Sequence, residues 1–147
     1  MNTKELFLSN LKELMSVRNV TFVQLGKDIG MNDRTIRRWY EDRAPKVESL
    51  IKIANYFHCS LDYLVGMSPI EFDYPPLTDK INFTERYKQL KKDTGLNDAK
   101  VAAICKVGTS TVCTWNQGTI PSFEIIVKLC GLFECCYEYI IGRVDNL

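Results

Sequence analysis

The sequence predicts an all-α protein made of two tandem five-helix units joined by a proline-containing linker. Apolar residues recur with helical spacing, and no stretch reads convincingly as a strand. The second half of the chain also repeats the first at a fixed offset of 76 residues. We therefore expect a first unit over residues 1–66, a linker over 67–82 and a second unit over 83–147.

The repeat aligns residues 7–66 with residues 83–142 without a gap. Twelve aligned positions are identical, and conservative apolar pairs fill the positions between them. The identical residues include the pairs Trp39 and Trp115, and Pro45 and Pro121. Two tryptophans and two prolines at the same offset are hard to produce by chance, so we interpret the pattern as a tandem duplication.

The first three helices follow from apolar spacing and from capping residues. A first helix is expected over residues 4–18. Thr21 is a suitable N-cap for a short second helix, and Gly30 ends that helix because glycine tolerates a left-handed backbone. Asn32 then caps a third helix. Its expected apolar side consists of Ile36, Trp39 and Tyr40.

Pro45 interrupts the chain before the last two helices of the unit. A fourth helix is expected over residues 47–57, and Ser60 caps a fifth that stops at Gly66. The second copy repeats the pattern over residues 83–94, 98–106, 109–116, 122–133 and 136–142. Between the copies, the linker holds Pro69, Pro75 and Pro76, which predict an extended and fairly stiff segment.

Both units contain a longer motif. Residues 21–66 read TFVQLGKDIGMNDRTIRRWYEDRAPKVESLIKIANYFHCSLDYLVG, and residues 97–142 repeat its spacing with a different third helix. Each copy resembles the lambda-repressor-like (Xre) helix-turn-helix family. The resemblance implies a transcriptional regulator whose third helix lies in the major groove of double-stranded DNA while the second helix braces it.

Carried over by position, the resemblance assigns the DNA contacts. In the first copy the residues aimed at bases are Asp33, Arg34, Arg37 and Arg38, of which Arg37 is also within reach of phosphate. The corresponding residues of the second copy are Thr109, Ser110 and Thr114, which bring no positive charge. The candidates for phosphate contacts are Thr21, Gln24, Arg43, Lys46, Lys100 and Lys106.

Two departures from the family pattern stand out. Lys106 occupies the turn position at which the first copy has Gly30. Phe22 occupies a position in the second helix that is often polar in the family, which argues against a direct DNA contact there. Since phosphate neutralisation supplies much of the affinity for DNA, we expect the second copy to bind more weakly by itself.

Composition argues against several other classes of function, among them enzymes, metalloproteins and membrane proteins. The formal charge is +1, so a nucleic-acid partner has to be argued from local charge. With one histidine, six cysteines in no CxxC pair and no glycine-rich phosphate loop, the sequence predicts no enzyme, cofactor or metal site. No apolar run is long enough to span a bilayer and no secretory signal is evident, so we expect a cytoplasmic protein without a membrane partner.

Two alternatives stay open at this stage. A protein-interaction module, antitoxin-like or a dimerising scaffold, with weak DNA binding is the alternative to a sequence-specific repressor. The tandem units also allow two arrangements on DNA. One chain can place its two units on adjacent half-sites, or a homodimer can bind DNA with its first units and pair through its second units.

Overall fold

The computed structural model describes residues 2–69 and 80–144, and all of the regular structure in these residues is α-helical. The chain divides into two compact units, unit 1 at residues 1–79 and unit 2 at residues 80–147. The part of the predicted linker at residues 70–79 lies outside the described residues.

Unit 1 holds five helices in its described residues. They are α1 (Thr3–Arg18), α2 (Phe22–Ile29), α3 (Asp33–Arg38), α4 (Val47–Phe57) and α5 (Leu61–Leu64). The predicted caps Thr21, Asn32 and Ser60 are confirmed, because each side chain accepts a hydrogen bond from a backbone N–H of the following helix. Gly30 ends α2 in the left-handed conformation, with φ +76°.

Two predicted details of unit 1 are wrong. Helix α3 ends at Arg38, so Tyr40 lies in the turn beyond it and is 36% exposed. Because Tyr40 follows the end of α3, its ring packs edge to face against Phe22 on α2, and its hydroxyl donates to the carbonyl of Leu8 on α1, 3.2 Å away. Helix α5 also ends at Leu64, before Gly66, which lies in the turn with φ +83°.

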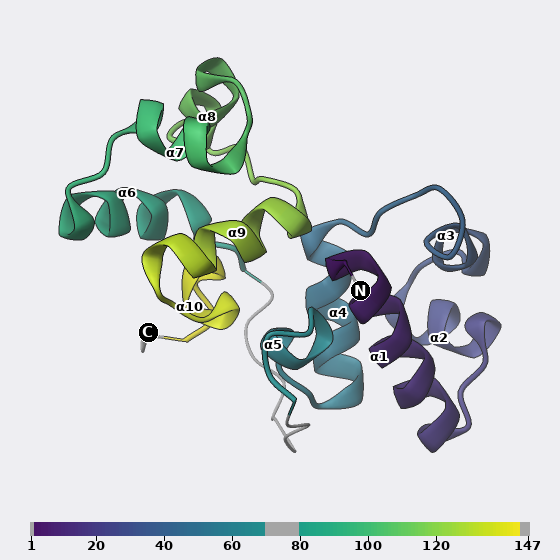
Figure 1. Ribbon diagram of the computed structural model, residues 1–147. Helices are drawn as coiled ribbons and strands as arrows, with labels where there is room; N and C mark the ends of the chain where they lie inside the picture. The colour runs from purple at the N-terminus through teal and green to yellow at the C-terminus, as the bar shows by residue number, and fades with distance from the viewer. Residues whose placement is uncertain (1, 70–79, 145–147) are drawn as a thin grey trace. The chain divides into compact units, whose positions relative to one another are not determined.

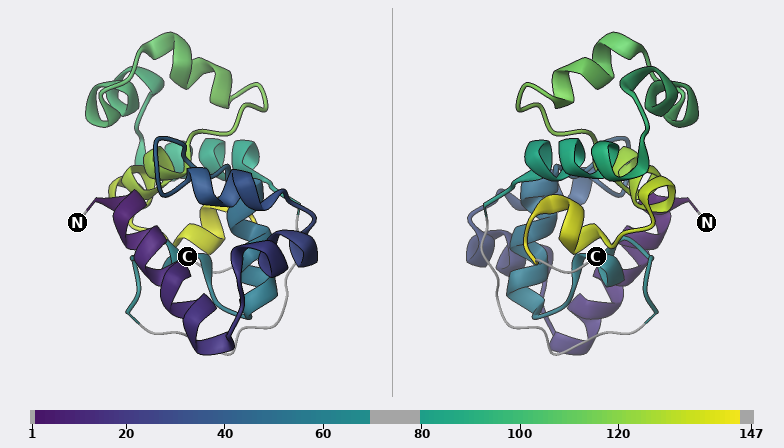
Figure 2. Two further views of the ribbon diagram at one scale, coloured as in Figure 1. Left: turned by 90° about the vertical axis from the view of Figure 1, so that its right-hand side faces the viewer. Right: turned by 90° about the vertical axis from the view of Figure 1, so that its left-hand side faces the viewer.

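The described residues of unit 2 also hold five helices. They are α6 (Phe83–Thr94), α7 (Asp98–Cys105), α8 (Thr109–Trp115), α9 (Phe123–Phe133) and α10 (Tyr137–Ile141). Each bound lies within one residue of the sequence-based prediction. Helices α6 and α9 lie between the α7–α8 pair on one side and α10 on the other (Figures 1 and 2).

Left-handed backbone recurs in the two units at one offset. Four positions with positive φ in unit 1 have counterparts 76 residues later, in the pairs Asn19 and Gly95, Gly30 and Lys106, His58 and Glu134, and Gly66 and Gly142. Each of these positions closes a helix or the turn after it. The same chain reversals are therefore used in both units, even where a residue other than glycine has to adopt them.

The core of each unit is built around a tryptophan. Trp39, which was predicted on an apolar helix side, and its counterpart Trp115 are both 2% exposed. Trp39 meets the Phe7 ring edge to face at 5.8 Å, and Trp115 meets Phe83 in the same way at 6.3 Å. Buried thiols contribute to these cores at Cys59, Cys105, Cys130 and Cys135.

Candidate nucleic-acid interface

Helices α2 and α3 pack closely at one side of unit 1, while α5 lies at the other side (Figure 1). Gly26 on α2 permits the close approach, since a Cβ at this position would lie 2.6 Å from the backbone oxygen of Met31. The Met31 N–H donates to the Gly26 carbonyl at 2.7 Å, which closes the turn. The local sequence thus fixes the angle between the two helices.

Helix α3 presents its basic side to solvent. Ile36 is fully buried, whereas the side chains of Arg34, Arg37 and Arg38 are exposed. The Arg34 backbone N–H donates to the Asn32 cap, which places the exposed Arg34 side chain in the first turn of the helix. A short helix with one buried and several cationic residues is suited to enter a negatively charged groove.

A groove of about 470 Å³ runs beside α3. It is lined by Met31, Thr35, Arg38, Trp39, Arg43, Ala44, Lys46 and Ser49. The Arg43 N–H donates to the Arg38 carbonyl at 3.1 Å, so the turn after α3 folds back and brings its cation to the helix. Lys46 immediately precedes α4. Three of the predicted contact residues, Arg38, Arg43 and Lys46, are thus brought together around one groove that suits an anionic group.

Arg37 points to a different neighbour, the start of α2. Its Nε donates to Asp33 Oδ2 at 3.1 Å, one helical turn earlier. Its guanidinium carbon also lies 5.3 Å from the centroid of the Phe22 ring. The structure therefore separates the predicted base-contacting residues, with Asp33 and Arg37 paired to each other and Arg38 facing the groove.

The predicted phosphate contacts at the start of α2 are partly occupied by internal hydrogen bonds. Thr21 Oγ1 accepts from the Gln24 N–H at 3.1 Å, and the Gln24 side-chain amide donates to Asp28 at 2.7 Å. The Tyr56 hydroxyl donates to the other Asp28 oxygen at 2.7 Å. The hydrogen bonds from the Gln24 amide and the Tyr56 hydroxyl lower the pKa of Asp28 below its usual value.

Sequence reasoning missed Asp28 and Tyr56 as neighbours of Gln24. The spacing of four residues between Gln24 and Asp28 was a usable signal, because side chains at i and i+4 of a helix are adjacent. No comparable signal exists for Tyr56, which reaches Asp28 from α4.

The residues predicted to contact bases in unit 2 carry no charge. Thr109 and Ser110 are exposed at the start of α8, and Thr114 donates its hydroxyl to the Thr111 carbonyl within the helix. The positions that match Arg43 and Lys46 are Thr119 and Ser122, so the groove cations are absent as well. Lys100 on α7 and Lys106 at the C-cap of α7, both predicted to contact phosphates, are exposed.

A polar cluster holds the helices of unit 2 together at its α6–α7 junction. Asp98 accepts hydrogen bonds from Lys91 at 2.6 Å, from the Tyr87 hydroxyl at 2.9 Å and from the Asn116 amide at 2.9 Å. Lys91 also donates to the Asn116 side-chain oxygen at 2.8 Å and lies over the Tyr87 ring. The Lys91 ammonium is thereby committed to neighbours inside unit 2.

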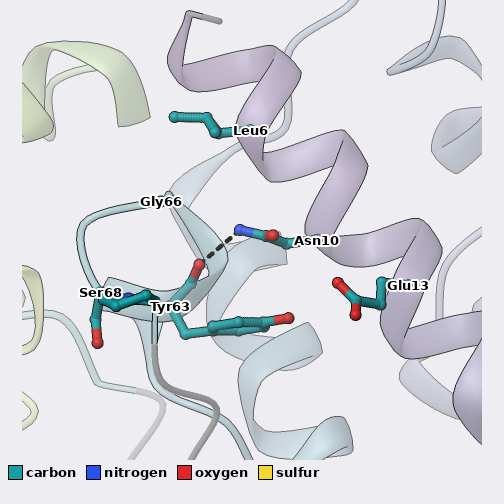
Figure 3. A pocket seen from close by; sticks show the side chains of 7 residues that line it. Leu6, Asn10, Glu13, Tyr63, Gly66 and Ser68 are labelled. Carbon is teal, nitrogen blue, oxygen red and sulfur yellow. Dashed lines mark hydrogen bonds between the residues drawn. The ribbon is translucent and has the colours of Figure 1, made fainter.

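A second pocket of unit 1, of about 460 Å³, lies between α1 and the turn after α5. The Asn10 amide donates to the Tyr63 carbonyl across it at 2.8 Å, and Glu13 supplies its carboxylate (Figure 3).

Within residues 2–69 and 80–144, no group of three or more His, Cys, Asp or Glu side chains is placed to hold a metal ion. In the same ranges, no helix has both the length and the apolarity to cross a lipid bilayer.

Comparison with known proteins bears on unit 1. Residues 10–69 match the family model described as a Cro/C1-type HTH DNA-binding domain. No curated protein matches the chain. One solved structure, titled as that of a transcriptional regulator from Listeria innocua, is 29% identical over 46% of this chain, with a TM-score of 0.42. The match covers 64% of that structure's own chain, which is less than two thirds of its length. The present chain thus contains a Cro/C1-type helix-turn-helix DNA-binding domain, which spans residues 10–69.

Proposed function

We propose that this protein is a sequence-specific transcriptional regulator, a repressor, that inserts α3 of unit 1 into the major groove of double-stranded DNA. The observation that carries the proposal is the exposed basic side of α3, flanked by the groove of Arg38, Arg43 and Lys46. Repression needs only that the bound protein occupies its operator. We further propose that it acts in the cytoplasm as a binding protein, with no catalytic step.

The proposed contacts divide by chemistry. An arginine guanidinium donates two parallel hydrogen bonds to guanine, and one good bidentate pair contributes about 1–3 kcal/mol of discrimination. Arg34, on the first turn of α3, is the foremost candidate for this role, with Arg38 beside it. Arg43 and Lys46, which line the groove beside α3, are suited to bind the phosphates that flank the major groove of the DNA.

Unit 2 is proposed to be a second, divergent copy of the same domain. The support is the shared register of Trp39 and Trp115, together with the left-handed positions that recur at the same offset. Because the α8 surface carries no cation at the positions that match the arginines of α3, we assign the main DNA contact to unit 1. Unit 2 then contributes either a weaker half-site contact or the interface of a homodimer.

The test is selection of binding sites from a random duplex library, followed by affinity measurements over a range of salt concentrations. We expect one enriched motif. The logarithm of the affinity should fall by about 0.9 per neutralised phosphate for each tenfold rise in salt concentration. Arg34→Ala should relax the preference at one base position. Lys12→Ala, which removes an exposed cation on α1, is the matched control and should leave the motif unchanged.

Two results would redirect the proposal. Binding that ignores salt and the Arg34 substitution would favour the alternative of a protein-interaction module. Sedimentation of the protein with and without the selected duplex separates the two roles of unit 2, because a homodimer places two chains on each site. A site bound by one chain would instead favour two tethered units on adjacent half-sites.

A further inference from the structure

The Phe22 ring forms a platform for the Arg37 guanidinium. The guanidinium carbon lies 5.3 Å from the ring centroid, and Nε is held by Asp33 at 3.1 Å. The Arg37 side chain nevertheless remains 55% exposed. One edge of the guanidinium is thus fixed by two neighbours while much of the group still faces solvent.

The platform is itself anchored. Tyr40 meets the Phe22 ring edge to face, with centroids 5.5 Å apart. The Tyr40 hydroxyl donates to the Leu8 carbonyl on α1 at 3.2 Å. A chain of contacts therefore runs from α1 through both rings to Arg37, and it holds the side chain of Arg37 toward the first turn of α2.

Unit 2 lacks the whole arrangement. The positions that match Phe22, Asp33, Arg37 and Tyr40 are Asp98, Thr109, Cys113 and Asn116. The ring is replaced by a carboxylate, the cation by a thiol, and the anchor by an amide that hydrogen-bonds that carboxylate. Platform, cation and anchor are therefore all absent from unit 2.

We propose that Phe22 and Tyr40 position Arg37 to bind a phosphate of the DNA backbone, not a base. A guanidinium bent back over a ring at the start of α2 lies beside the helix that braces α3, where a DNA strand would pass. Bidentate contact with guanine would require the same side chain to extend straight into the groove. Arg37 thus adds affinity without sequence preference, while Arg34 and Arg38 supply the preference. This inference rests on the proposed function.

The experiment compares the selected duplex with a scrambled duplex of the same length, at several salt concentrations. Arg37→Ala should weaken binding to both duplexes by a similar factor and reduce the salt slope by about 1. Arg34→Ala should instead lower the ratio of the two affinities by roughly 5- to 150-fold. Circular dichroism melts of each variant verify that it is folded.

The role of the ring is tested with Phe22→Leu, which keeps an apolar side chain but removes the aromatic face. It should weaken binding to both duplexes, have no further effect in an Arg37→Ala background, and be rescued by Phe22→Tyr. Arg37→Lys gives a second test that leaves the ring in place, because lysine keeps the charge but loses the planar stack. It should retain most of the salt slope.

The outcomes separate the two proposals. If Arg37→Ala changes the preferred base at any position of the selected motif, Arg37 contacts a base and the inference is wrong. If Phe22→Leu weakens binding equally with and without Arg37, the ring acts independently of Arg37 and the inference is also wrong. If the unaltered protein shows neither motif nor salt dependence, the proposed function itself fails.

Discussion

The Phe22 ring lies edge to face against the Tyr40 ring, and this contact joins the start of α2 to the turn after α3. In unit 2 the same two positions hold Asp98 and Asn116, which are joined by a hydrogen bond of 2.9 Å. The two units therefore join the same helices by different chemistry, an aromatic contact in unit 1 and a hydrogen bond in unit 2.

The aromatic contact should be measurable as a coupling energy. Phe22→Leu and Tyr40→Leu should together destabilise unit 1 by less than the sum of their separate effects, since either substitution alone already removes the contact. We expect a coupling of about 0.5–1.5 kcal/mol from denaturant unfolding of the single and double variants. Strict additivity would show that the rings do not stabilise each other.

Tyr40 should ionise late in an alkaline titration. Burial raises the pKa of Tyr40 to about 12. Since the folded protein keeps the proton more tightly than the unfolded chain, the stabilisation is complete below about pH 10 and is lost as the pH rises toward 12. Tyrosinate absorbance of the protein minus that of Tyr40→Phe isolates this ionisation. A difference curve centred on the ordinary tyrosine value would contradict it.

Asp98 should make unit 2 sensitive to acid. Burial raises its pKa, but the hydrogen bonds from Lys91 and Tyr87 outweigh this and bring the pKa of Asp98 below its usual 3.8. A lowered pKa in the folded state gives stability that is present above about pH 4 and is lost as the pH falls further. Asp98→Asn should therefore cost roughly 1–3 kcal/mol at neutral pH, with the difference shrinking in acid.

The control for this measurement is Asp42→Asn, which changes an exposed carboxylate in the turn after α3. Its unfolding free energy should stay within about 0.5 kcal/mol of that of the unaltered protein at neutral pH. A gap between Asp98→Asn and the unaltered protein that stays constant with pH would show that the charge of Asp98 is not what stabilises unit 2.

The contrast between the two units also shows what the sequence could and could not predict. Helix bounds came out within a few residues because caps such as Thr21 and Asn32 act on their own next turn. The arginines of α3 were singled out by position through the family resemblance, and the structure shows all three exposed.

Contacts between helices were beyond that reasoning. Lys91, Asp98 and Asn116 lie on three elements and meet only once α6, α7 and α8 are packed. The stacking of Arg37 on Phe22 depends equally on the angle between α2 and α3. Sequence reasoning therefore predicted which helix carries each candidate side chain but did not reveal which of them were held by neighbours.

Gly26 sets that angle, and its replacement gives the last prediction. A Cβ at position 26 would lie 2.6 Å from the Met31 oxygen and 3.1 Å from the Asp33 nitrogen, both of them backbone atoms. Backbone cannot swing aside as a flexible side chain would, so Gly26→Ala should force α2 and α3 apart. We expect a loss of about 1–3 kcal/mol in the unfolding free energy of unit 1, together with weaker DNA binding.

Gly131 provides the matched control, because it lies within α9 and a Cβ there would meet nothing within 4 Å. Gly131→Ala should raise the stability of unit 2 by up to about 1 kcal/mol, since alanine favours the helix more than glycine does. Unit 2 itself carries Ala102 at the position that matches Gly26. If Gly26→Ala does not lower the stability of unit 1, its turn accommodates the methyl group as the turn of unit 2 does. In that case the close approach of α2 to α3 does not depend on glycine.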